Sequence, residues 1–435
     1  MNAITGTEGT GKGLQGTGLA FAVGFFFAVR IIIGLLSVRV LGTAPRAGAE
    51  LSLVLDLLLL LLVCFHSLGY AQRTFGSMLR LPSIRWVVAF LVFSLCSLAW
   101  SATVSLPTSA AYWCGLAVDV AIVVLLLRAA SVTVISHSLL KGYVLGACCL
   151  ALIAWIMPSQ SDLRLGDEEF FNTNQIGNLC ATAIFLAQYL SRCKAGRWGF
   201  AILLLALTLL RSLSKTTIVA FLITESFLII ADRSISRKTK VLLTIAVVLV
   251  ILVFWGLFEA YYDIYTTAGN QAETLTGRTG IWAYMLSAAL EQPLIGHGFD
   301  SMWKVIPPFG PEKFEARHAE NELLTQFYAY GVVGVCLLIG IYGSLHRQIR
   351  RLPRGPLRIV FLCLLLFVVV RGLAEAEAFD LLLPLWSIVL ISLLLEHAVT
   401  LSDATSASLV AGRSDAPGAL LPLSTRRLPD RQTEI

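Results

Sequence analysis

Long apolar runs, separated by shorter polar connectors, dominate the chain between residues 18 and 397. A helix needs about 20 mostly apolar residues to cross a bilayer, and it satisfies its own backbone groups there. The chain holds twelve runs of about this length, at residues 18–38, 51–70, 86–105, 110–128, 142–158, 174–191, 198–212, 215–231, 241–259, 320–345, 359–373 and 379–397. The pattern predicts an all-α, polytopic membrane protein with about 12 transmembrane helices and both termini on one side.

Lysine and arginine are distributed unevenly between the connectors, and this bias predicts the orientation in the membrane. If both termini are cytoplasmic, the inner connectors and tails hold 22 basic residues, whereas the longer outer connectors hold 10. The inner loops are then short and basic, and the outer loops are longer and acidic. We therefore expect both termini in the cytoplasm.

Three segments differ from ordinary connectors. Residues 1–17 are rich in Gly and Thr, and residues 401–435 are rich in Ser, Ala, Pro and Arg, so both are predicted to be disordered cytoplasmic tails. Residues 260–319 mix aromatic residues with charges and prolines, and part of this stretch has helical spacing. Within a membrane domain of residues 18–400, we expect this segment to form a helical cap on the outer face, between helices nine and ten.

The composition excludes several classes of protein. Apolar residues make up 57% of the chain and charged residues only 14%, which is too little polar surface for a water-soluble enzyme or a nucleic-acid-binding protein. Eight of the nine cysteines lie in apolar runs, and no Cys-x-x-Cys pair occurs. We therefore expect no disulfides, no structural zinc and no nucleic-acid partner.

Three cationic residues lie at outer boundaries of the apolar runs. Arg278 follows a Gly-flanked turn, shortly before Trp282, which can anchor a short helix at the interface. Arg211 and Lys215 flank a two-serine turn between two tightly coupled runs. A guanidinium fork binds phosphate or carboxylate well, and cations at a membrane boundary favour an anionic partner. Pairing of Arg278 with Glu273 or a lipid headgroup, and snorkelling of Lys215, are the structural alternatives.

A candidate proton acceptor lies where the long polar segment meets the tenth run. Residues 317–324 read Arg-His-Ala-Glu-Asn-Glu-Leu-Leu, so His318, Glu320, Asn321 and Glu322 are close together. Histidine is a natural general base near neutral pH, and a carboxylate two residues away can orient it or act instead. We interpret this segment as a site for catalysis or substrate binding.

Two further polar groups lie on the outer side. Arg371 is followed by Glu375, Glu377 and Asp380, which predicts an ion-pair network that faces the bundle interior. Asn174 begins the sixth run after an acidic loop with aromatic neighbours, a composition typical of sugar binding. Helix capping explains this asparagine equally well.

The order of these motifs resembles the O-antigen ligase and polysaccharide polymerase superfamily. The resemblance covers roughly residues 160–345 and rests on an Asn-Gln-Ile-Gly helix start, a Ser-rich basic turn, an Arg-Thr-x-x-Trp helix, Pro-x-x-Gly-x-Gly, and His-x-x-Asn followed by Gly-x-x-Gly. The segment Leu-Thr-Gly-Arg-Thr-Gly-Ile-Trp, with Gly-Phe and a tryptophan further on, is most similar to exopolysaccharide polymerases of the succinoglycan or xanthan type.

The resemblance implies inverting glycosyl transfer without a metal or another cofactor, on the periplasmic face of a bacterial inner membrane, in a GT-C-like helical fold. The donor would be a glycan on undecaprenyl diphosphate that enters sideways from the membrane lipid. Arg278, with Arg211 or Lys215, would bind the diphosphate and stabilise it as a leaving group, and a base at His318 or Glu320 would deprotonate the attacking hydroxyl. Residues implied in glycan binding are Asn174, Trp282, Asn321, Glu322 and Arg371.

The chain departs from the ligase pattern at the base. In ligases a histidine directly precedes the asparagine that lies ten positions before Gly-x-x-Gly. Here Asn321 has that spacing, but Glu320 precedes it and His318 lies two places earlier. Either Glu320 is the base or His318 reaches the same point from the loop, and both alternatives stay open.

The leading hypothesis is a polymerase that joins repeat units carried on undecaprenyl diphosphate, alone or with a chain-length regulator or export complex. The first alternative is a ligase that moves finished polymer onto lipid A-core, and the second is a polysaccharide or lipid transporter or flippase. Asp56, Asp119 and Glu225 lie singly in separate runs and give little support to a proton-coupled transporter.

Overall fold

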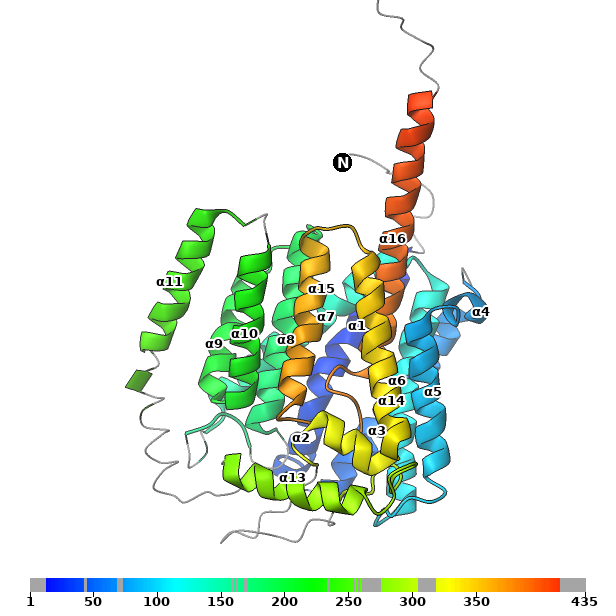
Figure 1. Cartoon of the computed structure of the whole chain (residues 1–435), viewed down its shortest axis with the longest axis vertical. Helices are drawn as coiled ribbons and strands as arrows, with labels where there is room; N and C mark the ends of the chain where they lie inside the picture. The colour runs from blue at the N-terminus through cyan, green and yellow to red at the C-terminus, as the bar shows by residue number, and fades with distance from the viewer. Residues whose placement is uncertain are drawn as a thin grey trace, which may run out of the picture.

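The computed structural model describes residues 13–42, 45–68, 73–158, 160, 163–167, 171–232, 235–253, 255–256, 259, 275–303 and 318–414. All regular secondary structure within these residues is helical, which confirms the predicted all-α class (Figure 1). The elements are α1 (Gly13–Val29), the 3₁₀ turn η1 (Arg30–Ile32), α2 (Ile33–Arg39), α3 (Pro45–Ser67), α4 (Phe75–Met78), α5 (Pro82–Ser97), α6 (Leu106–Ala129), α7 (Val132–Ile156), α8 (Thr173–Arg192), α9 (Gly199–Ser212), α10 (Lys215–Ala231), α11 (Arg237–Val253), α13 (Leu275–Ala289), α14 (Glu322–Arg351), α15 (Pro356–Gly372) and α16 (Leu385–Ser414).

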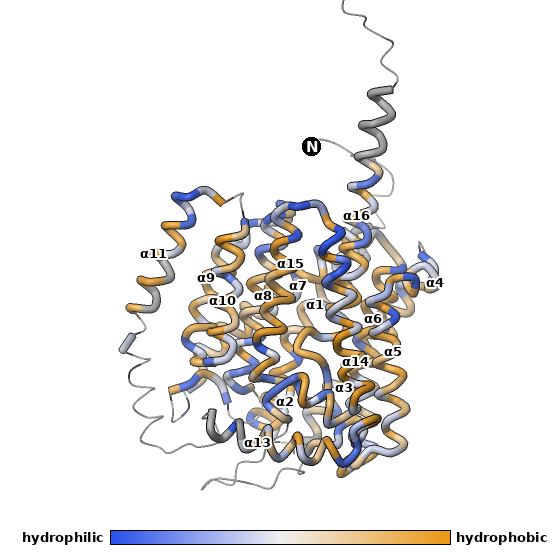
Figure 2. The backbone as a smooth tube through the Cα atoms, in the orientation of Figure 1, coloured by the Kyte–Doolittle hydropathy of each residue, from blue (hydrophilic) through white to orange (hydrophobic). Residues whose placement is uncertain are grey.

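Each of the twelve predicted runs overlaps a helix. Figure 2 shows helices that are apolar along much of their length, with polar residues gathered toward the two ends of the bundle. Among the described residues, six helices are long and apolar enough to cross a membrane: Gly16–Arg39, Ala47–Ser67, Leu106–Ala129, Val132–Ile156, Glu322–Arg351 and Leu385–Ala404. The chain is therefore a polytopic membrane protein, and the exact number of twelve spans stays a prediction.

Helix α13 lies across one end of the bundle, in the segment predicted to form a cap (Figure 1). We call this end the α13 end. The rest of the predicted cap, at 260–274 and 304–317, lies outside the described residues, as do residues 1–12 and 415–435 of the predicted tails. Helix α1 begins inside the first predicted tail, and α16 continues into the second.

The Pro-x-x-Gly-x-Gly segment packs against a break in α14. At Gly331 the backbone has a φ of 62° and a ψ of −154°, so the helix is interrupted there. The backbone N–H of Val332 donates to the carbonyl of Pro293 at 2.8 Å, which satisfies a group that the break leaves without a helical partner. Gly296 also has a positive φ, and a Cβ atom at this position would meet the Ala329 carbonyl. The glycines therefore permit a close backbone contact.

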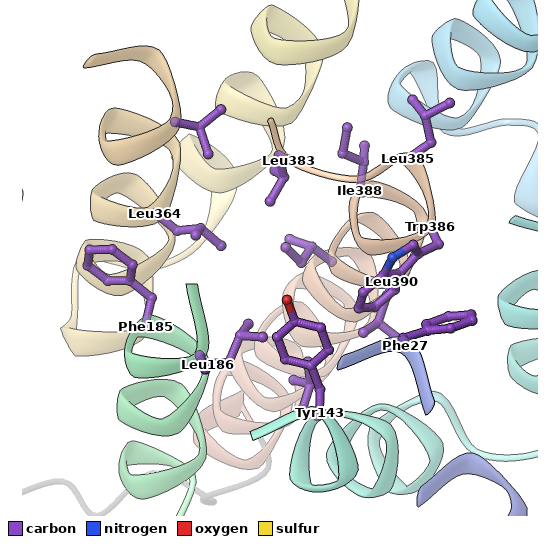
Figure 3. Close-up of a cluster of buried hydrophobic side chains, with 14 of the residues drawn as sticks. Phe27, Tyr143, Phe185, Leu186, Leu364, Leu383, Leu385, Trp386, Ile388 and Leu390 are labelled. Carbon is purple, nitrogen blue, oxygen red and sulfur yellow. The ribbon is translucent and has the colours of Figure 1, made fainter. Parts of the chain in front are cut away.

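The connector between α15 and α16 enters the interior of the bundle. Leu381 and Leu383 in this connector are fully buried, and Figure 3 shows Leu383 within the apolar core. The Asp380 carboxylate accepts hydrogen bonds from the backbone N–H groups of Leu381 at 2.7 Å and Leu385 at 3.2 Å. The last apolar run was predicted to begin at 379, but α16 begins at Leu385, because Pro384 favours a helix start over an uninterrupted helix.

Three charged residues that looked isolated in the sequence meet inside the bundle. Arg30, in the 3₁₀ turn η1, lies 2.6 Å from a carboxylate oxygen of Asp119 in α6 and 3.6 Å from one of Asp56 in α3. Both aspartates are buried. Asp56 and Asp119 lie in separate helices, as the sequence indicates, and the packing of the helices brings both to one arginine.

Replacing Gly296 by alanine tests the contact between the glycine turn and α14. The added Cβ meets backbone atoms of the break, and a positive φ disfavours alanine by at least about 1–2 kcal/mol. We expect a lower thermal unfolding midpoint in detergent. Gly343→Ala, in the regular part of α14 with no atom within 4 Å of the added Cβ, is the matched control and should not lower it. Equal midpoints for the two variants would contradict the prediction.

Candidate active site

Arg278 of α13 joins three separate parts of the chain at the α13 end. Its Nη1 donates to the carbonyl of Ala374 at 2.8 Å and to Oγ1 of Thr216 at 3.2 Å. Its Nη2 donates to Oε1 of Glu375 at 3.2 Å and lies 3.3 Å from Oε2 of Glu320. The guanidinium therefore links the cap helix to the start of α10, the segment before α14 and the connector after α15.

Glu375 is the buried centre of this cluster. Besides the bond from Arg278, its Oε1 accepts a hydrogen bond from Nδ2 of Asn174 at 2.8 Å. Its Oε2 lies 3.7 Å from the guanidinium of Arg371, which is itself 1% exposed and also lies 3.8 Å from Glu377. Two arginines and three glutamates thus form one network, with Glu320 as its third carboxylate.

The two-serine turn before α10 supports the same network. The hydroxyl of Ser214 donates to Oδ1 of Asn174 at 2.8 Å, and its oxygen lies 2.9 Å from Oγ1 of Thr217. Thr217 in turn accepts from Nε of Arg371 at 3.2 Å. A Cβ at Gly177 would lie 3.0 Å from Cβ of Ser214, so the glycine of the Asn-Gln-Ile-Gly motif lets α8 approach this turn. Both motifs therefore serve to place polar groups beside Glu375.

The segment before α14 holds the two predicted bases side by side. Nδ1 of His318 accepts a hydrogen bond from the backbone N–H of Glu320 at 3.3 Å and lies 3.7 Å from Oε1 of the same residue. Because Nδ1 accepts this bond, the neutral ring carries its proton on Nε2. Glu320 has a φ of 50°, a left-handed conformation that is strained for a residue with a Cβ. Asn321 caps α14 and donates from Nδ2 to the carbonyl of Leu373 at 2.9 Å.

Burial decides the protonation of these groups. Desolvation raises the pKa of Glu375 to about 7; the nearby Glu320 adds to the rise, and Arg371 opposes it. Burial also raises the pKa of Glu320, against the attraction of Arg278 and Arg371, and it lowers the pKa of His318. The site thus combines a neutral histidine with one carboxyl group, that of Glu375, that can take up a proton near neutral pH.

Other predicted site residues lie differently. Arg211 donates from Nη1 to the carbonyl of Leu163 at 2.6 Å, so its guanidinium is engaged by the 163–167 segment. The side chain of Lys215 is exposed at the start of α10, directly before Thr216. Trp282 is half-buried and packs in a small apolar cluster beneath α13.

Glu322 is bonded to other parts of the protein interior. It is buried, and its Oε1 accepts hydrogen bonds from the Tyr342 hydroxyl at 2.8 Å and from the backbone N–H of Leu382 at 2.9 Å. It therefore joins α14 to the connector after α15. Its place in glycan binding, predicted from the sequence, has no support from this geometry.

Sequence reasoning missed two members of the site. Glu375 was predicted as an ion-pair partner of Arg371 but not as the partner of Arg278, and Thr216 was not singled out at all. The signal for Glu375 was its four-residue spacing from an arginine at a membrane boundary. No signal in the sequence marks the carbonyl of Ala374, because any residue supplies one.

Two comparisons with known proteins indicate the family that this chain resembles. Residues 200–339, which run from α9 into α14 and include Arg278, His318 and Glu320, match the O-antigen ligase family. The chain is also 26% identical, over 332 residues, to the exopolysaccharide production protein ExoQ of Rhizobium meliloti (strain 1021), with 68% of this chain and 73% of that protein covered. The resemblance predicted from the sequence is confirmed: the chain is similar to the O-antigen ligase and polysaccharide polymerase superfamily, close to exopolysaccharide polymerases.

Replacing Arg371 by methionine tests whether this buried cation holds the network together. Methionine keeps the apolar volume of the side chain but removes the cation that pairs with Glu375 and Glu377. Removal of one partner of a buried ion pair typically destabilises a protein by about 3–5 kcal/mol. We expect a lower unfolding midpoint, with a loss that grows as the pH rises above the raised pKa values of these glutamates.

Arg354→Met, at an exposed position between α14 and α15, is the control for the loss of a cation. Its midpoint should stay within a degree or so of the parent protein, since exposed charges contribute little. A pH-independent loss for Arg371→Met would show that packing, not charge, accounts for the effect.

Proposed function

We propose that the chain is a membrane glycan polymerase. It transfers oligosaccharide repeat units from undecaprenyl diphosphate onto a growing glycan, at the periplasmic face of the bacterial inner membrane. The observation that carries this proposal is the contact of Arg278 with Glu320 at 3.3 Å, because a guanidinium suits a phosphate and a carboxylate beside it suits a proton acceptor. The family match and the exopolysaccharide relative support the same reaction class.

The reaction is a single displacement at the anomeric carbon of the donor sugar. A hydroxyl oxygen of the acceptor forms the new glycosidic bond while the bond to the diphosphate oxygen breaks, with inversion of configuration. The electron pair of the breaking bond goes to the diphosphate, whose growing charge Arg278 stabilises. The hydroxyl proton goes to the base. No step uses a metal or a cofactor.

Glu320 is the favoured base in this scheme. Its raised pKa makes it a stronger proton acceptor than an ordinary glutamate, and its Oε2 makes no hydrogen bond among the described residues. His318 is less suited, because its Nδ1 is occupied by the Glu320 backbone and its Nε2 already carries the ring proton. His318 instead orients the Glu320 backbone.

Arg278 changes partners during the cycle we propose. Without donor it binds the carboxylates of Glu375 and Glu320. When a diphosphate arrives, the guanidinium can bind it through the same fork and release Glu320 toward the acceptor hydroxyl. Lys215, exposed at the start of α10, would add a second positive charge in this scheme. Arg211 would first have to leave the carbonyl of Leu163.

Ligation of finished polymer onto lipid A-core is the second candidate, since the matched family is that of O-antigen ligases. The two reactions share donor and site and differ in the acceptor. Strains that lack the protein separate them: single repeat units point to a polymerase, and full-length polymer retained on its carrier points to a ligase.

Arg278→Ala should abolish transfer while the protein still inserts into the membrane. Losing one preorganised donor to a developing oxyanion costs about 10²–10³ in rate, and Arg278 supplies two such nitrogens. Polymer length in a complemented strain and transfer by purified protein in vesicles are the two measurements. Arg350→Ala, exposed at the opposite end of α14, is the control. Normal polymer from the Arg278 variant would remove this arginine from the mechanism.

The base is identified by comparing Glu320→Gln with His318→Ala. We expect the larger loss for Glu320→Gln, because a glutamine cannot accept the proton. In the parent protein, activity should fall as the pH drops through the raised pKa of Glu320, so the acid limb lies above the ordinary glutamate value of 4.5. An inactive His318 variant beside an active Glu320 variant would reverse the assignment.

A further inference from the structure

A second group of polar side chains lies at the α13 end, around Asp300. This residue follows the Gly-x-Gly turn and has a φ of 56°, a left-handed conformation that is strained for a residue with a Cβ. Its Oδ2 accepts a hydrogen bond from the Ser109 hydroxyl at 2.6 Å and lies 3.5 Å from Oγ1 of Thr103. Asp300 is partly exposed, and its other carboxylate oxygen has no hydrogen-bond partner among the described residues. That oxygen is therefore available to a ligand.

An aromatic pair lies beside this carboxylate. Tyr112, on the same face of α6 as Ser109, stacks on Phe379 of the connector between α15 and α16, with ring centroids 4.1 Å apart and planes 20° apart. The Phe379 ring also lies 6.3 Å from the ring of Phe299, which directly precedes Asp300. Tyr112 and Phe379 are both partly exposed. The carboxylate, its hydroxyl neighbours and the two rings thus form one group, which we call the Asp300 cluster: Thr103, Ser109, Tyr112, Asp300 and Phe379.

The connector between α15 and α16 joins the Asp300 cluster to the candidate active site. Glu375, which is bonded to Arg278, and Phe379 are four residues apart, so their Cα atoms are separated by at most about 14 Å. Glu377, between them, keeps 33% of its side chain exposed. An oligosaccharide of a few sugars can therefore contact the aromatic pair and still reach the carboxylates at Arg278.

The Asp300 cluster and Arg278 lie on opposite sides of the α13 end. Arg278 donates to Thr216 of α10, whereas Asp300 accepts from Ser109 of α6, and Figure 1 shows α13 crossing the bundle from the α10 side to the α6 side. In an inverting displacement the incoming oxygen approaches the face of the sugar opposite the leaving group. With a diphosphate at Arg278, the acceptor therefore approaches from the side on which the Asp300 cluster lies.

We propose that the Asp300 cluster is the binding site of the acceptor saccharide. The Asp300 carboxylate accepts hydrogen bonds from sugar hydroxyls, and the rings of Tyr112 and Phe379 pack against the C–H face of a sugar. The bound saccharide presents its terminal hydroxyl to Glu320. This inference rests on the proposed function, because it takes the reaction to have a saccharide acceptor. It adds a specificity site made of residues outside the Arg278 network.

The chemistry of the cluster favours a saccharide over a cation or a lipid. A calcium ion takes six to eight oxygen ligands with several carboxylates among them, whereas a single carboxylate is present here. A hydrocarbon chain brings no donor for the Asp300 oxygen. A saccharide supplies both the hydroxyl donors and the apolar face that this combination of groups requires.

The test is acceptor kinetics with the full-length protein in vesicles. The probe is the free repeat-unit oligosaccharide, released by mild acid from the lipid-linked intermediates of a strain that lacks the protein. Asp300→Asn keeps the shape of the side chain and tolerates the left-handed backbone. We expect the KM for this probe to rise about tenfold, as for a lost hydrogen bond to a charged group, with kcat and the KM for the lipid-linked donor unchanged. Asp403→Asn, exposed on α16, is the matched control.

Phe379→Leu tests the aromatic part of the same site and leaves the carboxylate in place. It keeps apolar volume but removes the flat ring, and we expect a severalfold rise in the acceptor KM. Phe200→Leu, 81% exposed at the start of α9, is the control and should change nothing. Calorimetric titration of each variant with the oligosaccharide measures binding without transfer, and the unfolding midpoint in detergent is recorded beside it.

The outcomes separate this site from the proposed function. A lower midpoint and a lower kcat with an unchanged acceptor KM would show that Asp300 only ties the loop to α6, and would overturn the site. Transfer with unchanged acceptor KM and unchanged binding in Asp300→Asn and Phe379→Leu would overturn it too and keep the polymerase. Oligosaccharide binding that Asp300→Asn weakens, in a protein that performs no transfer, would keep the site and refute the polymerase.

Discussion

The contact of Arg278 with two carboxylates is the interaction on which the rest of the site depends. A guanidinium and two glutamates are expensive to remove from water, and they stay ionised in a largely buried place only when they compensate one another. Arg278 meets Glu375 and Glu320 within 3.3 Å. Because the three residues belong to different segments, their pairing fixes where α13 lies over the bundle and how the segment before α14 meets the connector after α15.

Backbone features make this meeting possible. The break at Gly331 lets the Pro-x-x-Gly-x-Gly turn bond directly to α14, which positions the end of α13. Two neighbours of Glu320 bond to the connector between α15 and α16. Glu322 accepts a hydrogen bond from the backbone N–H of Leu382, and Asn321 donates one to the carbonyl of Leu373. The glycine and asparagine motifs thus position the charged side chains.

The sequence predicts the depth of a residue in the membrane far better than it predicts which residues lie beside it in the fold. Hydropathy places a side chain along the bilayer normal, so it indicated that Arg278, Glu320 and Arg371 all lie near one end of the bundle. It contains no information on the lateral order of helices, which depends on packing. For this reason the pairing of Arg278 with Glu375 was missed. Arg211 was grouped with the same site, but its guanidinium donates to the carbonyl of Leu163 instead.

The same limit explains the charged residues within the bundle. Asp56 and Asp119 are 63 positions apart, and nothing in their local sequence indicates a shared partner. The packing of α1, α3 and α6 brings both to Arg30, at the one place where a 3₁₀ turn interrupts the first helix. The apolar runs can be predicted from one helix at a time, and each of them overlaps a helix. The meeting of Arg30, Asp56 and Asp119 needed several helices at once and was missed.

The charge of the site constrains how it could accept the anionic donor that we propose. With every carboxyl group ionised, Arg278 and Arg371 face Glu320, Glu375 and Glu377, which leaves a net negative charge that repels a diphosphate. Burial raises the pKa of Glu375 to about 7, so this residue can bind a proton at little cost near neutral pH. A protonated Glu375 no longer competes for Arg278, and its neutral carboxyl can stay hydrogen-bonded to Asn174. In the mechanism we propose, proton uptake by Glu375 would therefore lower the negative charge that an incoming diphosphate meets.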